Sequence, residues 1–127
     1  MLRPIPERML GNVVTVKVCI GVDEWQNPSW QDTTVKKVHL QNTNEVKKAK
    51  DNTEVVLRSV LFIDSVRSFP HLDYDALAVQ SEEAGRPMRA VVFTSDGTKV
   101  GDYEVKIVDT VPDVPATRVH HVELGLV

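Results

Sequence analysis

One cysteine, Cys19, occurs among the 127 residues. A single thiol cannot close an intramolecular disulfide, so the sequence excludes a disulfide-stapled secreted domain and favours a reducing compartment. Long apolar runs are also missing, because none approaches the roughly 18 to 20 residues that a membrane-spanning helix needs. The first eight residues contain two prolines and lack the apolar segment of a secretion signal. We therefore expect a soluble protein without a membrane partner.

Neither sign of charge is in large excess. Fifteen Lys and Arg oppose eighteen Asp and Glu, for a formal net charge of −3. This balance excludes a protein that coats nucleic acid without sequence preference, because the surface of such a protein is strongly basic. Hydrophobic residues make up 42% of the chain, which is enough for a packed core. A length of 127 residues suits one compact domain, and we expect residues 1–127 to form it.

Alanine, the best helix former, is also scarce. It occurs six times, whereas valine occurs 23 times and is joined by nine threonines and four isoleucines. β-Branched side chains pack well on a pleated surface, so this bias favours strands. Apolar residues alternate with polar ones from Val14 to Ile20, as in a half-buried strand. Residues 55–63 are nearly all apolar and predict a central strand buried on both faces.

Six strands are expected in all, at 13–20, 33–40, 55–63, 88–94, 98–108 and 118–126. Their number and spacing predict a mainly β fold, a small antiparallel barrel or sandwich with long loops and one short helix. That helix lies in the long connection 64–87, where Asp73 is a candidate N-cap, Ala84 the approximate end and Gly85 a stop signal. The remaining expected connections are an N-terminal arm (1–12), a hairpin loop with both tryptophans (21–32), a polar loop (41–54) and a stiff link (109–117).

The search for chemistry returns no cofactor or metal site. His120 and His121 are adjacent in an expected strand, so their side chains should point to opposite faces and cannot hold one ion together. His39 and His71 belong to other elements, without ligands at suitable spacing. We expect His120 on the apolar side of its strand and His121 exposed or at a subunit contact.

No set of residues suggests catalysis. Cys19 shares its strand face with Thr15 and Lys17 and has no base nearby in the sequence, so we expect a packed or half-exposed small residue. The run Ser95–Lys99 lacks the glycine spacing of a phosphate loop and is predicted to be a hairpin turn. We therefore expect no enzyme.

A group of lysines, Lys47, Lys48 and Lys50, falls in the expected polar loop. Two interpretations stay open. Surface charge runs usually keep a loop solvated and nothing more. The alternative is a mobile loop that approaches a polyanion.

Segments spread over roughly residues 5 to 126 together resemble a known family. They are Ile5–Leu10 before a Val-Thr-Val-Lys strand, Asp23–Trp30, Val35–Leu40, Val55–Asp64, Ser68–Pro70, Gly101–Val108 and Val119–Leu124. Their order is similar to that of minor capsid proteins of phages and prophages of Gram-positive bacteria. This family is associated with the head–tail connector, in particular with the stopper, or head-completion, ring. The segment 72–87 departs from the family in being richer in Ala and Glu.

The resemblance implies a structural virion protein of the phage neck, made in the bacterial cytoplasm and working as a homo-oligomeric ring. Implied partners are the portal or adaptor protein, a tail protein and the packaged double-stranded DNA in the channel. On this hypothesis Lys47, Lys48 and Lys50 form a channel-facing loop that contacts DNA. The segment with Trp25, Asn27, Pro28 and Trp30 is a subunit or tail contact, unless the tryptophans only cap the barrel.

Two alternatives remain. A neighbouring joining protein, either an adaptor or a tail terminator, would share the ring-forming logic. A monomeric β-barrel module that binds nucleic acid or a peptide is weaker, because the clear strand faces carry Val, Ile and Leu.

Overall fold

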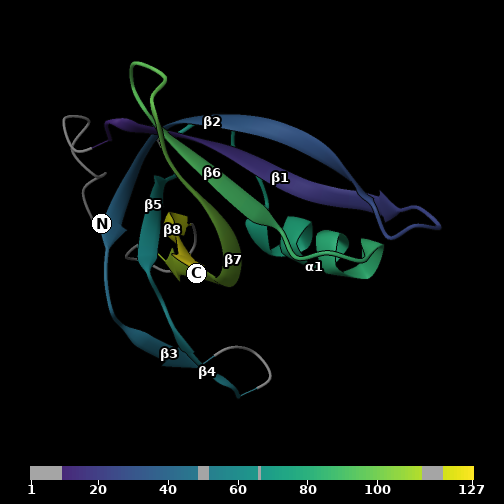
Figure 1. Cartoon of the computed structure of the whole chain (residues 1–127). Coiled ribbons are helices and arrows are strands. Elements are labelled where there is room, and N and C mark those ends of the chain that lie inside the picture. Colours follow the sequence, from purple (N-terminus) through teal and green to yellow (C-terminus); the bar gives the residue numbers. More distant parts are fainter. Residues whose placement is uncertain (1–9, 49–51, 66, 113–118) are drawn as a thin grey trace.

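The computed structural model describes residues 10–48, 52–65, 67–112 and 119–127. Six strands form a closed antiparallel barrel in the order β1-β2-β5-β8-β7-β6 (Figure 1). Their bounds are Asn12–Val22 (β1), Pro28–Asn42 (β2), Ser59–Asp64 (β5), Arg89–Thr94 (β6), Lys99–Pro112 (β7) and Val119–Leu126 (β8). A short helix α1 (Tyr74–Ala84) lies outside the barrel, and β3 (Val46–Lys48) with β4 (Glu54–Val56) forms a separate two-stranded sheet. The predicted fold class is confirmed.

Two three-stranded units build the barrel. One contains β1, β2 and β5, and the other contains β6, β7 and β8. Pairing of β1 with β6 and of β5 with β8 closes the ring. The connection from β5 to β6 contains α1, which packs on β1 and β7. Two hairpins project from the barrel (Figure 1). We call the outer end of the β1–β2 hairpin, with the turn 23–27, the finger, and the β3–β4 sheet the arm.

The core fills the inside of the barrel with aliphatic side chains from every barrel strand. Leu61 of β5 lies between Leu40 of β2 and Leu124 of β8, and both Leu61 and Leu124 are fully buried. Alternate residues of β1 point inward in the same way, because side chains of a strand alternate between its two faces. The buried cluster comprises Val14, Val16, Val18, Val35, Val38, Leu61, Ile63, Tyr74, Met88, Ala90, Val92, Tyr103, Val105, Leu124 and Leu126.

Helix α1 begins and ends where the sequence predicts. The Asp73 side chain accepts a hydrogen bond from the Ala76 backbone N–H at 3.2 Å, and Gly85 ends the helix with φ +122°. A Cβ on Gly85 would also lie 2.6 Å from Cγ2 of Val22, so glycine is required here for space as well. The buried Ser81 hydroxyl joins the helix to β1, since it accepts from the Cys19 N–H at 2.9 Å.

One expectation about β1 is wrong. Ile20 was expected on the apolar face but is 55% exposed, because the pairing of β1 with β2 skips one residue between Cys19 and Gly21. Such a bulge leaves the extra residue outside the ladder and interrupts the alternation of faces. Cys19 is fully buried beneath α1, where its sulfur approaches the Ala84 carbonyl oxygen at 3.8 Å.

The expected strand 55–63 is two strands. Leu57 still belongs to the arm, because its N–H donates to the Glu45 carbonyl at 2.9 Å. The next residue, Arg58, donates to Leu126 of β8 at 2.8 Å, so the chain changes partner within one residue. Only β5 is the expected strand buried on both faces.

Four expected connections are shorter than predicted, because strands extend into them. The first strand starts at Asn12, within the expected N-terminal arm, whose residues 1–9 are outside the described part of the chain. The finger turn spans only 23–27, and the expected polar loop 41–54 contains β3 and the first residue of β4. Strand β7 continues to Pro112. Among the residues described, no helix has the length and apolar character to cross a bilayer.

Candidate functional site

The turn at the end of the finger is held by the side chain of one residue. Oδ1 of Asp23 accepts hydrogen bonds from the backbone N–H of Trp25 at 2.9 Å and of Asn27 at 2.8 Å. The Asp23 carbonyl also accepts from the Gln26 N–H at 3.0 Å. An Arg86 guanidinium N–H donates to the Gln26 carbonyl at 2.7 Å and joins the turn to the end of α1. The tip is therefore a defined structure, as Asp-centred turns are.

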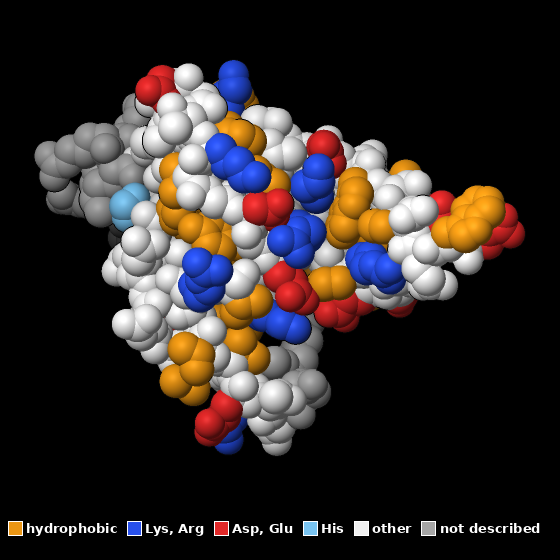
Figure 2. Space-filling view, viewed as in Figure 1, with side chains coloured by type: hydrophobic (Ala, Val, Ile, Leu, Met, Phe, Trp, Pro, Cys, Tyr) orange, Lys and Arg blue, Asp and Glu red, His pale blue; other side chains and the backbone are white. Residues whose placement is uncertain are grey.

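This turn displays an aromatic side chain to solvent. Trp25 is 74% exposed, and Asp23 and Glu24 beside it are exposed as well. Hydrophobic and acidic side chains accordingly lie together at the end of the finger (Figure 2). Exposed tryptophans are frequent anchors of protein interfaces.

The other predicted contact residues of this segment are not all in a loop. Asn27 is exposed and ends the turn, whereas Pro28 is the first residue of β2. Trp30 lies inside β2, opposite Cys19, and is half-buried. The structure thus separates Trp25, which points into solvent, from Trp30, which is part of the strand.

The arm carries a second exposed apolar group. Val46 and Val56 pair directly across β3 and β4 and are 56% and 61% exposed. A two-stranded sheet by itself is marginally stable in water, so an arm of this kind gains stability when its apolar face is covered. No motif in the sequence identifies this arm, because both its strands are only three residues long.

The three predicted channel lysines are in different settings. Lys47 is half-buried, and its amine lies 3.9 Å from Glu45 and 3.8 Å from Asp109 of β7. Lys48 is exposed, and Lys50 lies outside the described residues. Ion pairs this long between partly exposed groups contribute little to stability. The Lys47 pair with Asp109 nevertheless shows that the base of the arm lies against β7.

A groove of about 700 Å³ opens between the arm, α1 and β7. Its apolar lining comes from Ala78 and Val79 of the helix and from Val105, Ile107 and Val108 of β7; its charged lining consists of Lys47, Lys48, Lys106, Asp75, Glu82 and Asp109. Sequence reasoning missed this groove, because its three walls come from segments far apart in the chain. A concave surface lined by apolar and charged side chains is suited to bind a side chain of another molecule.

The two adjacent histidines are in contact, which corrects the prediction of opposite faces. Nδ1 of His120 lies 2.7 Å from Nδ1 of His121, and both residues are half-buried. Strand pairing explains this: Val111 of β7 pairs with His121 and Pro112 pairs with Val119, so His120 is an extra residue in a bulge. A bulge removes the strict alternation of faces. The described part of the chain contains no group of three or more His, Cys, Asp or Glu that is placed to hold a metal ion.

Acid is expected to destabilise the fold through His121. Burial lowers the pKa of His121, and the neighbouring His120 lowers it further, against an opposing effect of Glu123, Asp64 and Asp109. The unfolded chain therefore takes up a proton as the pH falls below about 6.5 before the folded chain does, so stability falls over this range. Urea titrations at pH 7 and pH 5 should show this loss, and His121→Gln should reduce it. His71→Gln, at an exposed histidine, is the matched control, and an equal pH dependence in all three proteins would contradict the assignment.

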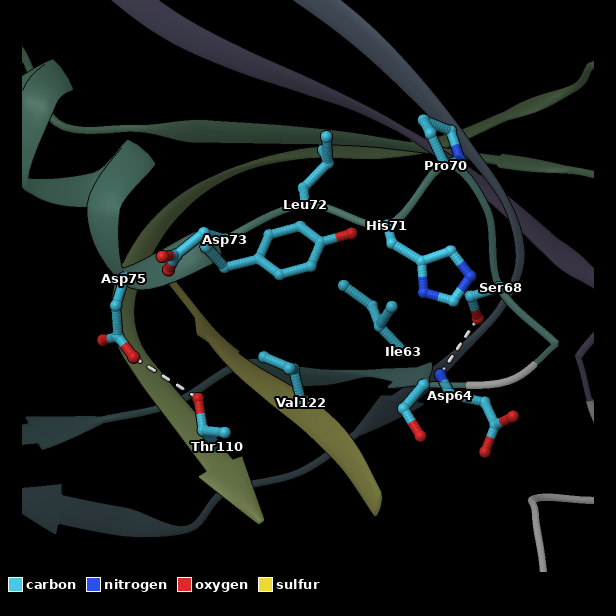
Figure 3. A pocket seen from close by; sticks show the side chains of 12 residues that line it. Ile63, Asp64, Ser68, Pro70, His71, Leu72, Asp73, Asp75, Thr110 and Val122 are labelled. Carbon is cyan, nitrogen blue, oxygen red and sulfur yellow. Dashed lines mark hydrogen bonds between the residues drawn. The ribbon is translucent and has the colours of Figure 1, made fainter. Parts of the chain in front are cut away.

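A cavity of about 460 Å³ lies between the end of β5, the following loop, the start of α1 and β7 with β8. Ile63, Leu72 and Val122 give it an apolar character (Figure 3). Several of its polar groups are bonded within the fold: the Asp64 N–H donates to the Ser68 hydroxyl at 2.9 Å, and the Thr110 hydroxyl donates to Asp75 at 3.3 Å.

The Ser68 hydroxyl in turn donates to the Lys37 carbonyl, so it holds the loop against β2. The Asp64 carboxylate is buried and accepts from the Arg67 backbone N–H at 2.8 Å. These contacts shape the loop between β5 and α1.

Tyr74→Phe is expected to stabilise the protein by about 1 kcal/mol. The Tyr74 hydroxyl is enclosed and has no hydrogen-bond partner among the described residues, and burial raises the pKa of the phenol. A buried hydroxyl without a partner costs about 1–3 kcal/mol, which phenylalanine avoids at nearly the same shape. Urea unfolding of both proteins measures the difference. Tyr103→Phe is the control at a second buried tyrosine, and a loss of stability in Tyr74→Phe would show that the hydroxyl is satisfied.

Comparisons with protein-family models, with curated proteins and with solved structures find no match to this chain.

Proposed function

We propose that this chain is a structural protein of a phage neck, a stopper subunit that assembles as a ring beneath the portal. One observation carries the proposal: a closed barrel projects two hairpins that bear exposed apolar side chains, Trp25 on the finger and Val46 with Val56 on the arm. Side chains of this kind are costly in water and are typical of surfaces that another protein covers. The sequence resemblance to head–tail connector proteins supports the same conclusion.

The barrel itself favours assembly through hairpins. Each of its six strands pairs with two neighbours, so the ring of strands has no edge strand, although parts of β2 and β7 pair on one side only. We therefore expect contacts between copies to use the finger and the arm, which project in different directions (Figure 1). Two different patches that meet between identical copies give a head-to-tail contact, and such contacts form a ring when the rotation from copy to copy closes.

A neighbouring adaptor or tail terminator remains the second candidate, since it would use the same ring-forming elements. The monomeric nucleic-acid module is disfavoured by the finger. Single-strand binders stack bases on aromatic side chains in a basic groove, whereas Trp25 lies beside Asp23 and Glu24. Acidic neighbours repel phosphates.

Electron microscopy of phage heads made with and without this chain tests the proposal. A stopper is required after DNA packaging, so heads that lack it should fail to attach tails and should lose their DNA. Adding the purified chain back should restore a ring at the portal vertex. Tail attachment without the chain would overturn the proposal, and a ring found on the tail instead of the head would favour the tail terminator.

We further propose that the lysines predicted to form a channel-facing loop contact the packaged DNA. Changing Lys47, Lys48 and Lys50 to glutamine removes three amines that offer counter-charge to phosphates, so we expect more virions to lose their genome. The measurement is the fraction of DNA-filled particles after storage at low and high salt. Lys17→Gln, on β1 of the barrel, is the control for loss of a lysine elsewhere. Equal retention by the triple variant and the control would contradict DNA contact by the arm.

A further inference from the structure

We infer that the finger of one copy docks in the groove between the arm, α1 and β7 of a second copy. The inference rests on the proposed ring and names the contact that would build it. It joins two features that the structure leaves separate in one chain, an exposed Trp25 and an apolar groove of about 700 Å³.

The finger is built to present its tryptophan. Its turn is held by two hydrogen bonds to Asp23 and by the bond from Arg86, so little backbone freedom remains to be lost when Trp25 becomes buried. Preorganisation of this kind raises affinity by lowering the entropic cost of binding. A large aromatic side chain that enters a pocket is also the commonest form of an interface hot spot.

The groove offers the matching surface. Ile107 and Val108 of β7 line it, and Val79 on the α1 side is 45% exposed. Covering these side chains with an indole ring removes apolar surface from water on both partners. The groove is open and large enough to admit one aromatic side chain with its turn.

Charge gives the docking an orientation. Asp23 and Glu24 flank Trp25, while Lys48 and Lys106 line the groove on its arm and β7 side. Lys106 also lies 3.3 Å from Glu104, in a partly exposed ion pair of the kind that contributes little to stability. Two of the groove's carboxylates already have partners, since Asp109 lies 3.8 Å from Lys47 and Asp75 accepts from Thr110. The third, Glu82, is on the helix wall, so the acidic side of the finger is directed toward the lysines and away from the helix.

The contact has to be made between copies. The finger turn is tied to the end of α1 by the bond from Arg86 to Gln26 and projects away from the barrel (Figure 1). The groove lies instead at the base of the arm, where Lys47 meets Asp109 of β7. A chain cannot reach its own groove with its own finger in this arrangement, and each copy presents one finger and one groove. This is the head-to-tail geometry that generates a ring.

Cysteine cross-linking tests the contact. Glu24→Cys on the finger and Val79→Cys in the groove are purified as separate full-length proteins, mixed, and treated with a short bis-maleimide. We expect about tenfold more mixed dimer than with Glu24→Cys and Thr98→Cys, because the exposed Thr98 lies on the β6–β7 turn away from the groove. The native Cys19 is buried, and the unmodified protein controls for its reaction. Cross-linking equal to that of the control pair overturns the inference.

Charge reversal gives a second, independent result. Glu24→Lys, in a chain without the added cysteines, should weaken self-association in sedimentation velocity, and Lys106→Glu in the same chain should restore it. Weakening without rescue counts against a contact between Glu24 and the lysines of the groove. Failure of this docking contact can be distinguished from failure of the proposed function. If Trp25→Ala prevents ring formation but the Glu24–Val79 pair does not cross-link, another protein or another surface receives the finger and the ring proposal stands. If heads without this chain attach tails, the proposed function fails whatever the cross-linking shows.

Discussion

Leu61→Ala is expected to lower the free energy of unfolding by about 3–4 kcal/mol. Leu61 is fully buried in the barrel, paired with Leu40 on one side and Leu124 on the other. Removing its isobutyl group loses the transfer free energy of the buried carbons and leaves a cavity that strands on both sides hold open. Because domains of this size have a total stability of roughly 5–15 kcal/mol, much of the stability would be lost. Urea titration followed by circular dichroism measures the change.

The matched control is Val56→Ala in the arm. Val56 is 61% exposed, so its truncation should change stability by less than about 0.5 kcal/mol. A loss at Leu61 no larger than at Val56 would show that Leu61 is not in the packed core, and the barrel described here would be wrong.

Trp25→Ala is expected to weaken self-association by about 30-fold or more and to leave folding unchanged. Trp25 is 74% exposed, so its removal costs the monomer little, whereas truncation of a buried interface tryptophan costs at least about 2 kcal/mol of binding. The backbone bonds of the turn involve Asp23 and the Trp25 N–H, which alanine retains. Sedimentation velocity across a concentration series measures association, and thermal unfolding of the same samples checks the fold.

Val100→Ala is the control for association. Val100 is a large apolar residue that is 46% exposed on β7, away from the finger. If both variants associate like the parent protein, the finger is not a subunit contact. Loss of association with an equal loss of thermal stability would instead place Trp25 in the fold, in line with the barrel-capping alternative.

Local sequence signals were sufficient to predict where helix α1 begins and ends. The carboxylate of Asp73 and the backbone freedom of Gly85 act on their immediate neighbours, and both ends of α1 lie where these residues predict. The turn between β6 and β7 was predictable for the same reason, because Gly97 adopts φ +95°. Valine enrichment and alternation likewise predicted the barrel strands, since burial of one face imposes a period of two.

Local sequence signals failed to predict the structure where a strand pairs with a segment that is distant in the sequence. Residues 55–63 read as one apolar strand, but Leu57 pairs with Glu45 and Arg58 pairs with Leu126, which divides them between the arm and the barrel. The bulges at Ile20 and at His120 depend on the register with β2 and β7 in the same way. A one-residue slip in pairing leaves no trace in composition or periodicity.

The candidate contacts show the same division. The acidic turn with Trp25 was visible in the sequence. In the structure, Trp25 is the most exposed large apolar residue among those described. Trp30, nearby in the sequence, is half-buried because its strand extends to Pro28. The groove that we propose as receptor had no counterpart in the sequence analysis.

By itself, the sequence determined a valine-rich β-protein with one capped helix, because side-chain branching, alternation and capping act within a few residues. The tertiary structure alone decided which strands close the ring, where the ladder skips a residue, and that a short arm stands against β7 and α1. These depend on hydrogen bonds and packing between segments tens of residues apart, where the free energy of a contact is set by the partner and not by the local sequence.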